Sequence, residues 1–412
     1  MSMFRFLTRP IDPEPLLRWA RRRWEHQPTA TLFWLGAFLR VWVYLGNRPY
    51  WMDEGSLRSN LTGVGILDFS RPLNSDQLAP FGFLIVERLA VTFWGDSGFA
   101  TRLFPLICGI VALGLFQRLA DRLLSRSGAI LAMILAALSD DWIYYSSELK
   151  PYSCDLAFGL FLTLLTCKEL REGRGGRGLI PLGTLAVASP WFSFPSIFVV
   201  AGCGFALLAA RLWKRRWREA GALAAVAAGW AVSALLAVRA AGRMLHEFTS
   251  MYVFWNFAFL PFPPTDRRSL EKAAGILLET LVTPLNLIPP ILPHVFAGLA
   301  IGFLLVGIVS LARRDPAALA MLAAPLILAL AASALRKYPF HGRLILWLAP
   351  ALFLWVAEGA QVLRKRGGRS LQIAMVTLLL LYPCLDALYQ SSGSRPRDFN
   401  PHGDLRRNRF ME

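Results

Sequence analysis

Apolar runs long enough to cross a bilayer recur along the whole chain, separated by short polar breaks. A transmembrane helix needs roughly 20 mostly apolar residues, because the hydrocarbon core of a bilayer is about 30 Å thick. The runs predict spans at about residues 30–46, 99–117, 128–145, 152–167, 178–191, 194–212, 219–239, 295–312, 317–335, 344–362 and 371–389. The pattern therefore predicts an all-α polytopic membrane protein with about eleven transmembrane helices.

One further apolar segment, LAPFGFLIVERLAVTFWG at 78–95, differs from these runs because Glu87 and Arg88 lie at its centre. Charges at mid-membrane are costly, so we expect an amphipathic helix lying in the interface rather than a span. With this segment outside the membrane, the basic breaks fall in the cytoplasm, as the positive-inside rule requires. These breaks are 118–126, 168–177, 211–218, 313–314 and 364–369.

This topology divides the chain into three parts. A basic N-terminus, 1–29, lies in the cytoplasm and leads into a transmembrane domain, 30–389, with long outer loops at 47–98 and 240–294. A polar tail, 390–412, follows on the outer side. The second loop contains a Pro-rich turn and a predicted interfacial helix. The Ala-, Arg- and Leu-rich composition favours a bacterial plasma (inner) membrane.

Composition narrows the function classes. Of the 412 residues, 55% are hydrophobic and 17% charged, which is more apolar surface than a soluble domain can bury. The net charge of +17 gathers in the cytoplasmic breaks, so we expect contact with anionic membrane lipids and no nucleic-acid binding. The five cysteines show no metal-ligand spacing. The chain has no Walker loop, HExxH or CxxC, which argues against nucleotide hydrolysis and zinc proteolysis.

Candidate chemistry lies in three outer segments. The first loop holds Asp53 and Glu54, the turn 139–155 holds Glu148 and Lys150, and RKYPFHGR ends in Arg343. Carboxylates beside cations suit a reaction on a phosphorylated lipid. The cations would hold the phosphate while a carboxylate takes a proton from an attacking hydroxyl.

Four stretches, in the same order, resemble the GT-C superfamily of membrane glycosyltransferases. They are WMDEGSLRSNL, the segment from DQLAPFGF to LADRLL, IYYSSELKPYSCDL, and KYPFHGRLILWLAP. The similarity includes the protein O-mannosyltransferase-like and aminoarabinose-transferase-like enzymes and covers roughly residues 30–360. It implies a GT-C-like bundle and a polyprenyl-phosphate-linked sugar donor. It also implies inverting transfer, on the extracytoplasmic face, to a hydroxyl of a glycan, lipid or protein acceptor.

The resemblance also assigns residues by position. Asp53 matches the family's candidate base, and Glu148 matches its second acidic position. Arg343 resembles a cation that faces the donor phosphate, Lys150 stands where many relatives have Arg, and Gln77 stands where many have the His of a His-Pro-Pro motif. The candidate substrate contacts are Glu54, Gln77, Lys150, Tyr152, Tyr338, His341 and Arg343.

Several alternatives stay open. Glu54 could instead cap the following helix, and Tyr152 and Tyr338 could belong to the interfacial aromatic belt. A divalent metal ion could bridge Asp53 and Glu148, since hard cations favour carboxylate and phosphate oxygens; no other cofactor is expected. Arg40, inside the first span, needs a partner or an interface.

Two other functions also fit the sequence. One is a glycolipid transporter, because charges that line a cavity suit translocation as well as catalysis. The other is a non-catalytic GT-C-like subunit that docks a membrane-protein partner complex through its Trp-rich surface and polar tail. A transporter should tolerate Asp53→Asn, whereas a base-dependent transferase should not. No role follows for Asp140 and Asp141.

Overall fold

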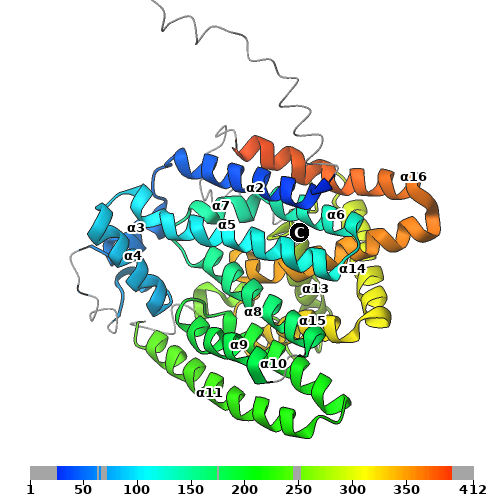
Figure 1. The fold of residues 1–412 in the computed structure, drawn as a ribbon. Coiled ribbons are helices and arrows are strands. Elements are labelled where there is room, and N and C mark those ends of the chain that lie inside the picture. The colour runs from blue at the N-terminus through cyan, green and yellow to red at the C-terminus, as the bar shows by residue number, and fades with distance from the viewer. Residues whose placement is uncertain (1–25, 63–64, 66–71, 174–175, 245–251, 392–412) are drawn as a thin grey trace, which may run out of the picture.

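The structure is a computed structural model that describes residues 26–62, 65, 72–173, 176–244 and 252–391. All regular secondary structure in these ranges is helical, which confirms the all-α prediction. The predicted cytoplasmic N-terminus lies almost wholly outside the described residues, and so does most of the predicted outer tail. Figure 1 shows the helices gathered in one bundle.

The longer helices are α2 (Pro28–Leu45), α5 (Gly98–Leu123), α8 (Tyr152–Glu172), α10 (Ser196–Trp213), α11 (Trp217–Gly242), α14 (Pro293–Arg314), α15 (Pro316–Ala334) and α16 (Ala349–Ser391). Shorter helices are α3 (Met52–Ser59), α4 (Phe81–Trp94), α6 (Arg126–Ala137), α7 (Asp140–Tyr144), α9 (Gly176–Ala188) and α13 (Arg267–Val282). Five short 3₁₀ segments join them: η3 (Asn74–Asp76), η4 (Tyr145–Ser147), η5 (Ser189–Trp191), η6 (Asn256–Ala258) and η7 (Gly342–Leu348).

Eight helices in the described part of the chain are long and apolar enough to cross a membrane, or nine if a bent pair counts as one span. Three of the eleven predicted spans do not form a straight apolar helix of that length. Residues 128–145 form the bent pair, α6 and the α7–η4 segment, with a 56° angle between its halves. Residues 152–167 lie in α8, which carries Asp155 in its first turn and Arg171 in its last. Residues 178–191 form a shorter apolar helix.

Helix α4 agrees with the non-spanning interpretation of segment 78–95. Its 14 residues extend only about 21 Å, less than the thickness of a hydrocarbon core. The side chain of Glu87 is fully buried, and α4 packs on α5. The carboxyl group of Glu87, at the centre of this segment, therefore faces protein and not lipid. The helix predicted in the second outer loop is also present, as α13.

Close helix crossings hold the bundle together. α5 packs against α2, α4, α6 and α8, and α14 packs along α16. At the α14–α16 crossing, a Cβ added to Gly307 or Gly359 would lie within about 2 Å of a backbone carbonyl oxygen on the facing helix. Small residues of this kind let two membrane helices approach closely. Gly368, with φ of 84°, divides α16 into two spans.

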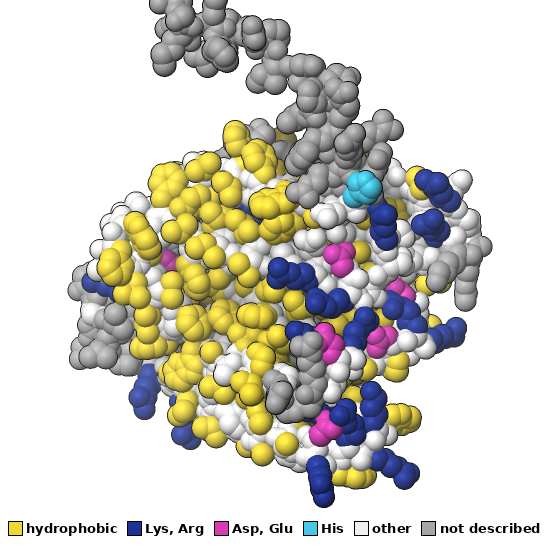
Figure 2. All heavy atoms as spheres, in the orientation of Figure 1, with side chains coloured by type: hydrophobic (Ala, Val, Ile, Leu, Met, Phe, Trp, Pro, Cys, Tyr) yellow, Lys and Arg dark blue, Asp and Glu magenta, His cyan; other side chains and the backbone are white. Residues whose placement is uncertain are grey.

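The outer surface fits a membrane protein. Figure 2 shows hydrophobic side chains spread over the face that carries α2 and α5. Lys and Arg gather toward the end where α16 bends, opposite the end that carries α3 and α4 (Figures 1 and 2). The apolar face suits contact with lipid tails, and a basic end is typical of a cytoplasmic surface.

Candidate active site

The acidic pair of the predicted first outer loop lies in the first turn of α3, two and three residues after the N-cap residue Trp51. Acidic residues are favoured there because a helix N-terminus carries partial positive charge and unpaired amides. The amide of Trp51 donates a hydrogen bond to the Glu54 carboxylate at 3.4 Å. Neighbouring helix residues point about 100° apart, so Asp53 and Glu54 face different surroundings.

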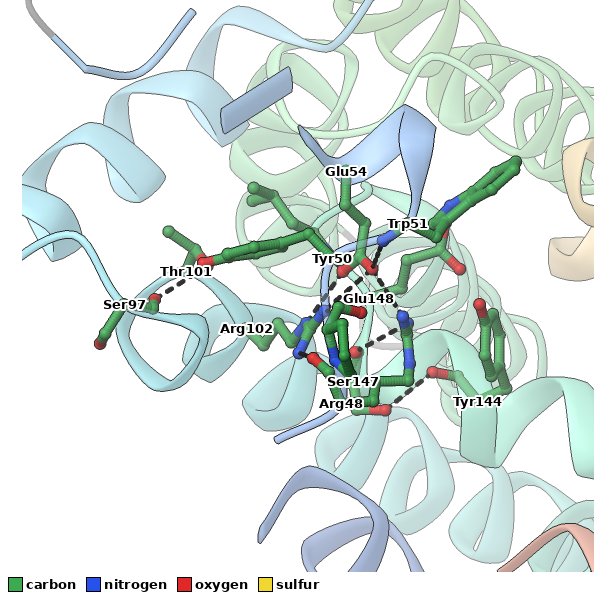
Figure 3. Close-up of polar contacts among 12 residues, drawn as sticks. Arg48, Tyr50, Trp51, Glu54, Ser97, Thr101, Arg102, Tyr144, Ser147 and Glu148 are labelled. Atoms are coloured by element: carbon green, nitrogen blue, oxygen red, sulfur yellow. Dashed lines mark hydrogen bonds and ion pairs between the residues drawn. The ribbon is translucent and has the colours of Figure 1, made fainter. Parts of the chain in front are cut away.

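Glu54 points into the protein and is fully buried. Its carboxylate accepts hydrogen bonds from Arg48 at 2.6 Å, from Arg102 at 2.8 and 2.9 Å, and from the amide of Leu149 at 2.9 Å (Figure 3). Burial opposes ionisation, but the two arginines and the amide outweigh it and hold the pKa of Glu54 below its usual range. Glu54 is thus an ionised anchor that ties α3 to α5 and to the segment before α8.

This arrangement leaves no oxygen of Glu54 for a substrate, so the structure favours a structural role over the predicted substrate contact. The sequence interpretation missed Arg102, which also donates to the backbone carbonyl of Arg48 at 2.7 Å and lies over the Tyr50 ring at 4.7 Å. A signal was available, because an arginine in the first turns of an apolar helix must have a buried partner. An acid in the preceding loop is the natural choice.

Asp53 meets a cation from the far end of the sequence. Arg343 Nη2 donates a hydrogen bond to Asp53 Oδ2 at 2.5 Å, and both side chains are about one-fifth exposed. The guanidinium of Arg343 lies 5.6 Å from the Trp51 ring centroid and 5.5 Å from that of Tyr152. The preceding Gly342 has φ of 49°, a conformation that glycine adopts without strain. Gly342 is the first residue of η7, and Arg343 is the second.

A second cation, Lys150, approaches from the segment before α8. Its Nζ donates to Gln77 Oε1 at 2.6 Å, and both side chains are buried. Burial opposes ionisation of Asp53, but Lys150, Arg343 and a hydrogen bond from Gln77 hold the pKa of Asp53 below its usual range. Burial also lowers the pKa of Lys150, against the attraction of Asp53. Asp53 thus has two cations and one amide around it.

Glu148 is the second carboxylate of the cluster and lies in the protein interior. Its side chain is 1% exposed, Oε1 accepts from Trp51 Nε1 at 3.4 Å, and Oε2 has no hydrogen-bond partner. Burial raises the pKa of Glu148 to about 7, although the Arg343 cation opposes the shift. The site therefore pairs an ionised carboxylate, Asp53, with one that titrates near neutral pH.

Two predicted contacts do not join this cluster. The hydroxyl of Tyr338 donates to the carbonyl of Leu344 and accepts from Trp347 Nε1, so Tyr338 braces η7, the segment that carries Arg343. His341 packs edge-on against the Phe257 ring, with centroids 5.0 Å apart. Tyr152, by contrast, is buried directly beside Arg343.

Two residues left open by the sequence find local roles. Arg40 is fully buried and donates to the carbonyls of Gly36, Ala136 and Ala137, so it satisfies the last carbonyls of α6 at the point where that helix ends. The expected partner of Arg40 is therefore backbone. Asp140 and Asp141 form the first turn of α7, where acids are favoured.

Metal-ligating side chains do not cluster around these charges among the described residues. In the part of the chain that the structure describes, no group of three or more His, Cys, Asp or Glu side chains is placed to hold a metal ion. Asp53 already pairs with Arg343, and Glu148 lies close enough to both Arg343 and Lys150 for these cations to affect its pKa. A divalent ion between the two carboxylates would face two existing cations.

Comparisons with known proteins point to one fold. Residues 78–235 match the family described as dolichyl-phosphate-mannose-protein mannosyltransferase. A search of curated proteins gives no match. Among solved structures, apo ArnT from Cupriavidus metallidurans superposes with a TM-score of 0.54 and 15% identity, over 84% of this chain and 62% of ArnT. ArnT bound to undecaprenyl phosphate gives 0.56 and 13%, over 94% and 69%.

The chain thus spans 62% of the length of the apo ArnT chain that it matches. At these identities the likeness describes the fold, and it extends over nearly all of this chain. The family match covers α4 to α11, which includes Glu148 and Lys150. The chain therefore has the fold of ArnT, and the family match of its segment 78–235 agrees with the sequence resemblance to GT-C membrane glycosyltransferases.

Proposed function

We propose that this protein transfers a sugar from a polyprenyl-phosphate donor to a hydroxyl acceptor, on the extracytoplasmic face of the plasma membrane. Two comparisons support this donor class. The family that matches residues 78–235 is named for dolichyl-phosphate-mannose, and one of the similar ArnT structures is bound to undecaprenyl phosphate. The single observation that carries the proposal is the convergence of Asp53 with the cations Arg343 and Lys150. In this orientation the basic breaks and the N-terminus lie in the cytoplasm.

The two cations provide the phosphate contact. Arg343 offers a planar fork of donors held between two aromatic rings, and Lys150 offers a point charge oriented by Gln77. Both come from segments at the same end of the bundle as α3. A donor phosphate that reaches Arg343 and Lys150 brings its anomeric carbon close to Asp53.

Asp53 then accepts the proton of the attacking hydroxyl. In the free protein the cations hold Asp53 ionised and weakly basic. A bound phosphate shares the charge of those cations and so raises the basicity of Asp53 when the acceptor arrives. Asp53 is therefore a stronger base in the complex with the donor than in the free protein, because the donor phosphate and Asp53 share the same cations.

The acceptor oxygen bonds to the anomeric carbon while its proton passes to Asp53, and the bond from that carbon to the phosphate oxygen breaks. The polyprenyl phosphate leaves with the electron pair, and Arg343 and Lys150 stabilise its second negative charge. Attack opposite the leaving group inverts the anomeric configuration.

Glu148 serves the acceptor side. Its unpartnered oxygen, Oε2, and its pKa near 7 allow it to accept a hydrogen bond from an acceptor hydroxyl once ionised. Trp51 holds the other oxygen and also lies beside Arg343. Trp51 therefore couples the acceptor side of the site to the donor side.

We propose further that the reaction does not depend on a divalent metal. Arg343 and Lys150 already supply the positive charge that a cation would bring to the donor phosphate.

The test is turnover by the purified protein in lipid nanodiscs, supplied with polyprenyl-phosphate-linked sugars and with candidate acceptors. Release of polyprenyl phosphate together with a glycosylated product is the expected result for wild type. Asp53→Asn should bind the donor but lower turnover by about 10²- to 10⁴-fold, the usual contribution of a general base. Asp96→Asn is the matched control, because Asp96 is also an acid paired with an arginine, Arg58, at 2.7 Å.

The same assay separates the rival functions. Donor movement between leaflets that survives Asp53→Asn, without any transfer product, would favour the glycolipid transporter. Absence of donor binding to the wild type, together with co-purification of a membrane complex, would favour the docking subunit. Either result would reject the transferase proposal.

A further inference from the structure

Two cations converge on one asparagine at the outer end of the bundle, away from the acid cluster. Arg336 Nη2 donates to Asn256 Oδ1 at 2.7 Å, and Lys272 Nζ donates to the backbone carbonyl of Asn256 at 3.1 Å. They come from different elements, the loop after α15 and helix α13. Arg336 also lies over the Phe259 ring at 5.6 Å.

The two cations have no acidic partner among the described residues. The contacts of Arg336 and Lys272 are to oxygens of Asn256 and to a ring. Nearby acids of α13 are engaged elsewhere: Asp266 caps the helix through Ser269, and Glu271 pairs with Arg267 at 2.7 Å. Burial and the neighbouring Arg336 lower the pKa of Lys272. Two cations that share one asparagine and have no acidic partner among the described residues favour an anion between them.

The scaffold beneath the pair is well fixed. The amide of Phe340 donates to the carbonyl of Ala258 at 2.9 Å, and the amide of Leu260 donates to Ser333 Oγ at 3.1 Å. Ser333 Oγ in turn donates to the carbonyl of Ala258. These bonds tie the η6 turn to the loop that carries Arg336. The cations are therefore held on a preformed surface, not on two independent side chains.

Exposed aromatic rings lie close in sequence to Asn256, the residue that accepts hydrogen bonds from both cations. Phe254, Phe257 and Phe262 are 61%, 47% and 72% exposed. Rings left exposed on a pinned turn suit the boundary between acyl chains and headgroups, where amphipathic surfaces bind. A cation pair beside them lies at the level of lipid phosphates. A soluble anion would gain nothing from this apolar margin.

Charge topology makes the pair unusual. Cations of a membrane protein are concentrated on the cytoplasmic side. Arg336, however, lies in the loop that leads to the candidate active site: the same loop contains His341, which is two residues before Arg343. His341 contacts the Phe257 ring, so this aromatic margin continues toward the candidate active site. The pair is thus a specific feature of the outer end and not part of the basic cytoplasmic surface.

We propose that Lys272 and Arg336, oriented by Asn256, form a second anion site that binds the phosphate of a membrane lipid headgroup, while the neighbouring phenylalanines contact its acyl chains. The site is separate from the Asp53 cluster and needs no sugar transfer. It positions a phosphate-bearing lipid at the rim of the candidate active site. Its ligand class is a lipid with an anionic phosphate headgroup in the leaflet that this end of the bundle faces.

The test is native mass spectrometry of the full chain in detergent, titrated with dioleoylphosphatidylglycerol, with dioleoylphosphatidylcholine or with inorganic phosphate. Wild type should bind one phosphatidylglycerol more tightly than phosphatidylcholine. The double variant Lys272→Gln/Arg336→Gln should weaken that step by about tenfold or more, because both cations that would contact the lipid phosphate are lost. Lys272→Arg/Arg336→Lys should retain it.

The matched control is Arg267→Gln/Arg268→Gln, which removes the same charge from the start of α13, outside the pair. Unchanged binding by this control and weakened binding by the Lys272/Arg336 variant would support the site. Equal loss in both would mean general electrostatic attraction, and no loss in either would also overturn the proposal. Binding of inorganic phosphate without phosphatidylglycerol would reject the lipid assignment. Thermal unfolding of each variant verifies that it is folded.

Discussion

Arg343 donates a hydrogen bond to Asp53 at 2.5 Å, although 290 positions separate the two residues in the sequence. The contact joins the first outer loop to the segment before the tenth predicted span. Lys150 adds a second cation from the middle of the chain. A carboxylate surrounded in this way stays ionised until another anion shares its cations, which is the basis of the proposed mechanism.

Replacing Arg343 should impair the donor side of the reaction. Arg343→Gln removes a charge-assisted contact, so we expect catalytic efficiency for the donor to fall by roughly 10- to 100-fold, the range for hydrogen bonds to charged groups. Arg343→Lys keeps the charge but loses the planar fork held between Trp51 and Tyr152. Its catalytic efficiency for the donor should therefore lie between that of wild type and that of Arg343→Gln. Donor kcat and KM measured in nanodiscs test this; a change confined to the acceptor KM would contradict it.

Glu148 should give the activity a pH dependence. Because burial raises the pKa of Glu148 to about 7, the ionised form that accepts a hydrogen bond grows as pH rises through this value. We expect kcat/KM for the acceptor to rise between about pH 6 and 8, the decades around that pKa. Glu148→Gln should be less active and should lack this limb. A wild-type profile that is flat over this range would reject the role.

The same residue should make stability depend on pH. The folded-state pKa of Glu148 lies above the unfolded value of 4.5, so the folded state binds the extra proton. The contribution of Glu148 protonation to the free energy of unfolding is fully present below about pH 4.5 and is lost as pH rises through about 7. Glu148→Gln should therefore gain up to about 3 kcal/mol over wild type at pH 8 but less than about 1 kcal/mol at pH 5. Thermal unfolding at the two pH values measures the difference; equal effects at both would contradict it.

Glu54 and Arg102 should behave as one structural unit. Glu54→Gln leaves Arg102 buried with an uncompensated charge, which typically costs about 3–5 kcal/mol. Removing both charges, as Glu54→Gln/Arg102→Gln, should cost less than the sum of the single changes. A double-mutant cycle of unfolding measures this coupling. The exposed pair Arg58–Asp96 is the matched control and should show about 1 kcal/mol or less.

Chelation should leave the transferase active. With Arg343 and Lys150 beside Asp53, we expect turnover to persist within about twofold in excess EDTA, since these cations already act on the phosphate. Activity before and after chelation, with and without added Mg²⁺ or Mn²⁺, tests this. Loss of turnover that Mg²⁺ restores would show that a metal bridges the carboxylates.

Much of the fold could be predicted from the sequence. Apolar length determined the long helices, because a span of given thickness needs a fixed number of residues, and eight of the eleven predicted spans correspond to candidate membrane helices. The adjacent residues Glu87 and Arg88 predicted a segment that does not span the membrane, and the short helix α4 agrees with this prediction. The predictions for 128–145, 152–167 and 178–191 were less accurate, since bends and charged helix ends are decided by packing against neighbours.

The sequence alone also selected the residues of the candidate site, because the resemblance assigns positions to Asp53, Glu148, Lys150 and Arg343, and the structure brings these four residues into one cluster. Only the tertiary structure decided which cation each carboxylate contacts. Two adjacent acids on one helix turn face different surroundings, so Glu54 meets Arg102 in the interior while Asp53 meets Arg343 at the surface. Which cation reaches which carboxylate depends on helix packing between distant segments, and local sequence carries no record of that geometry.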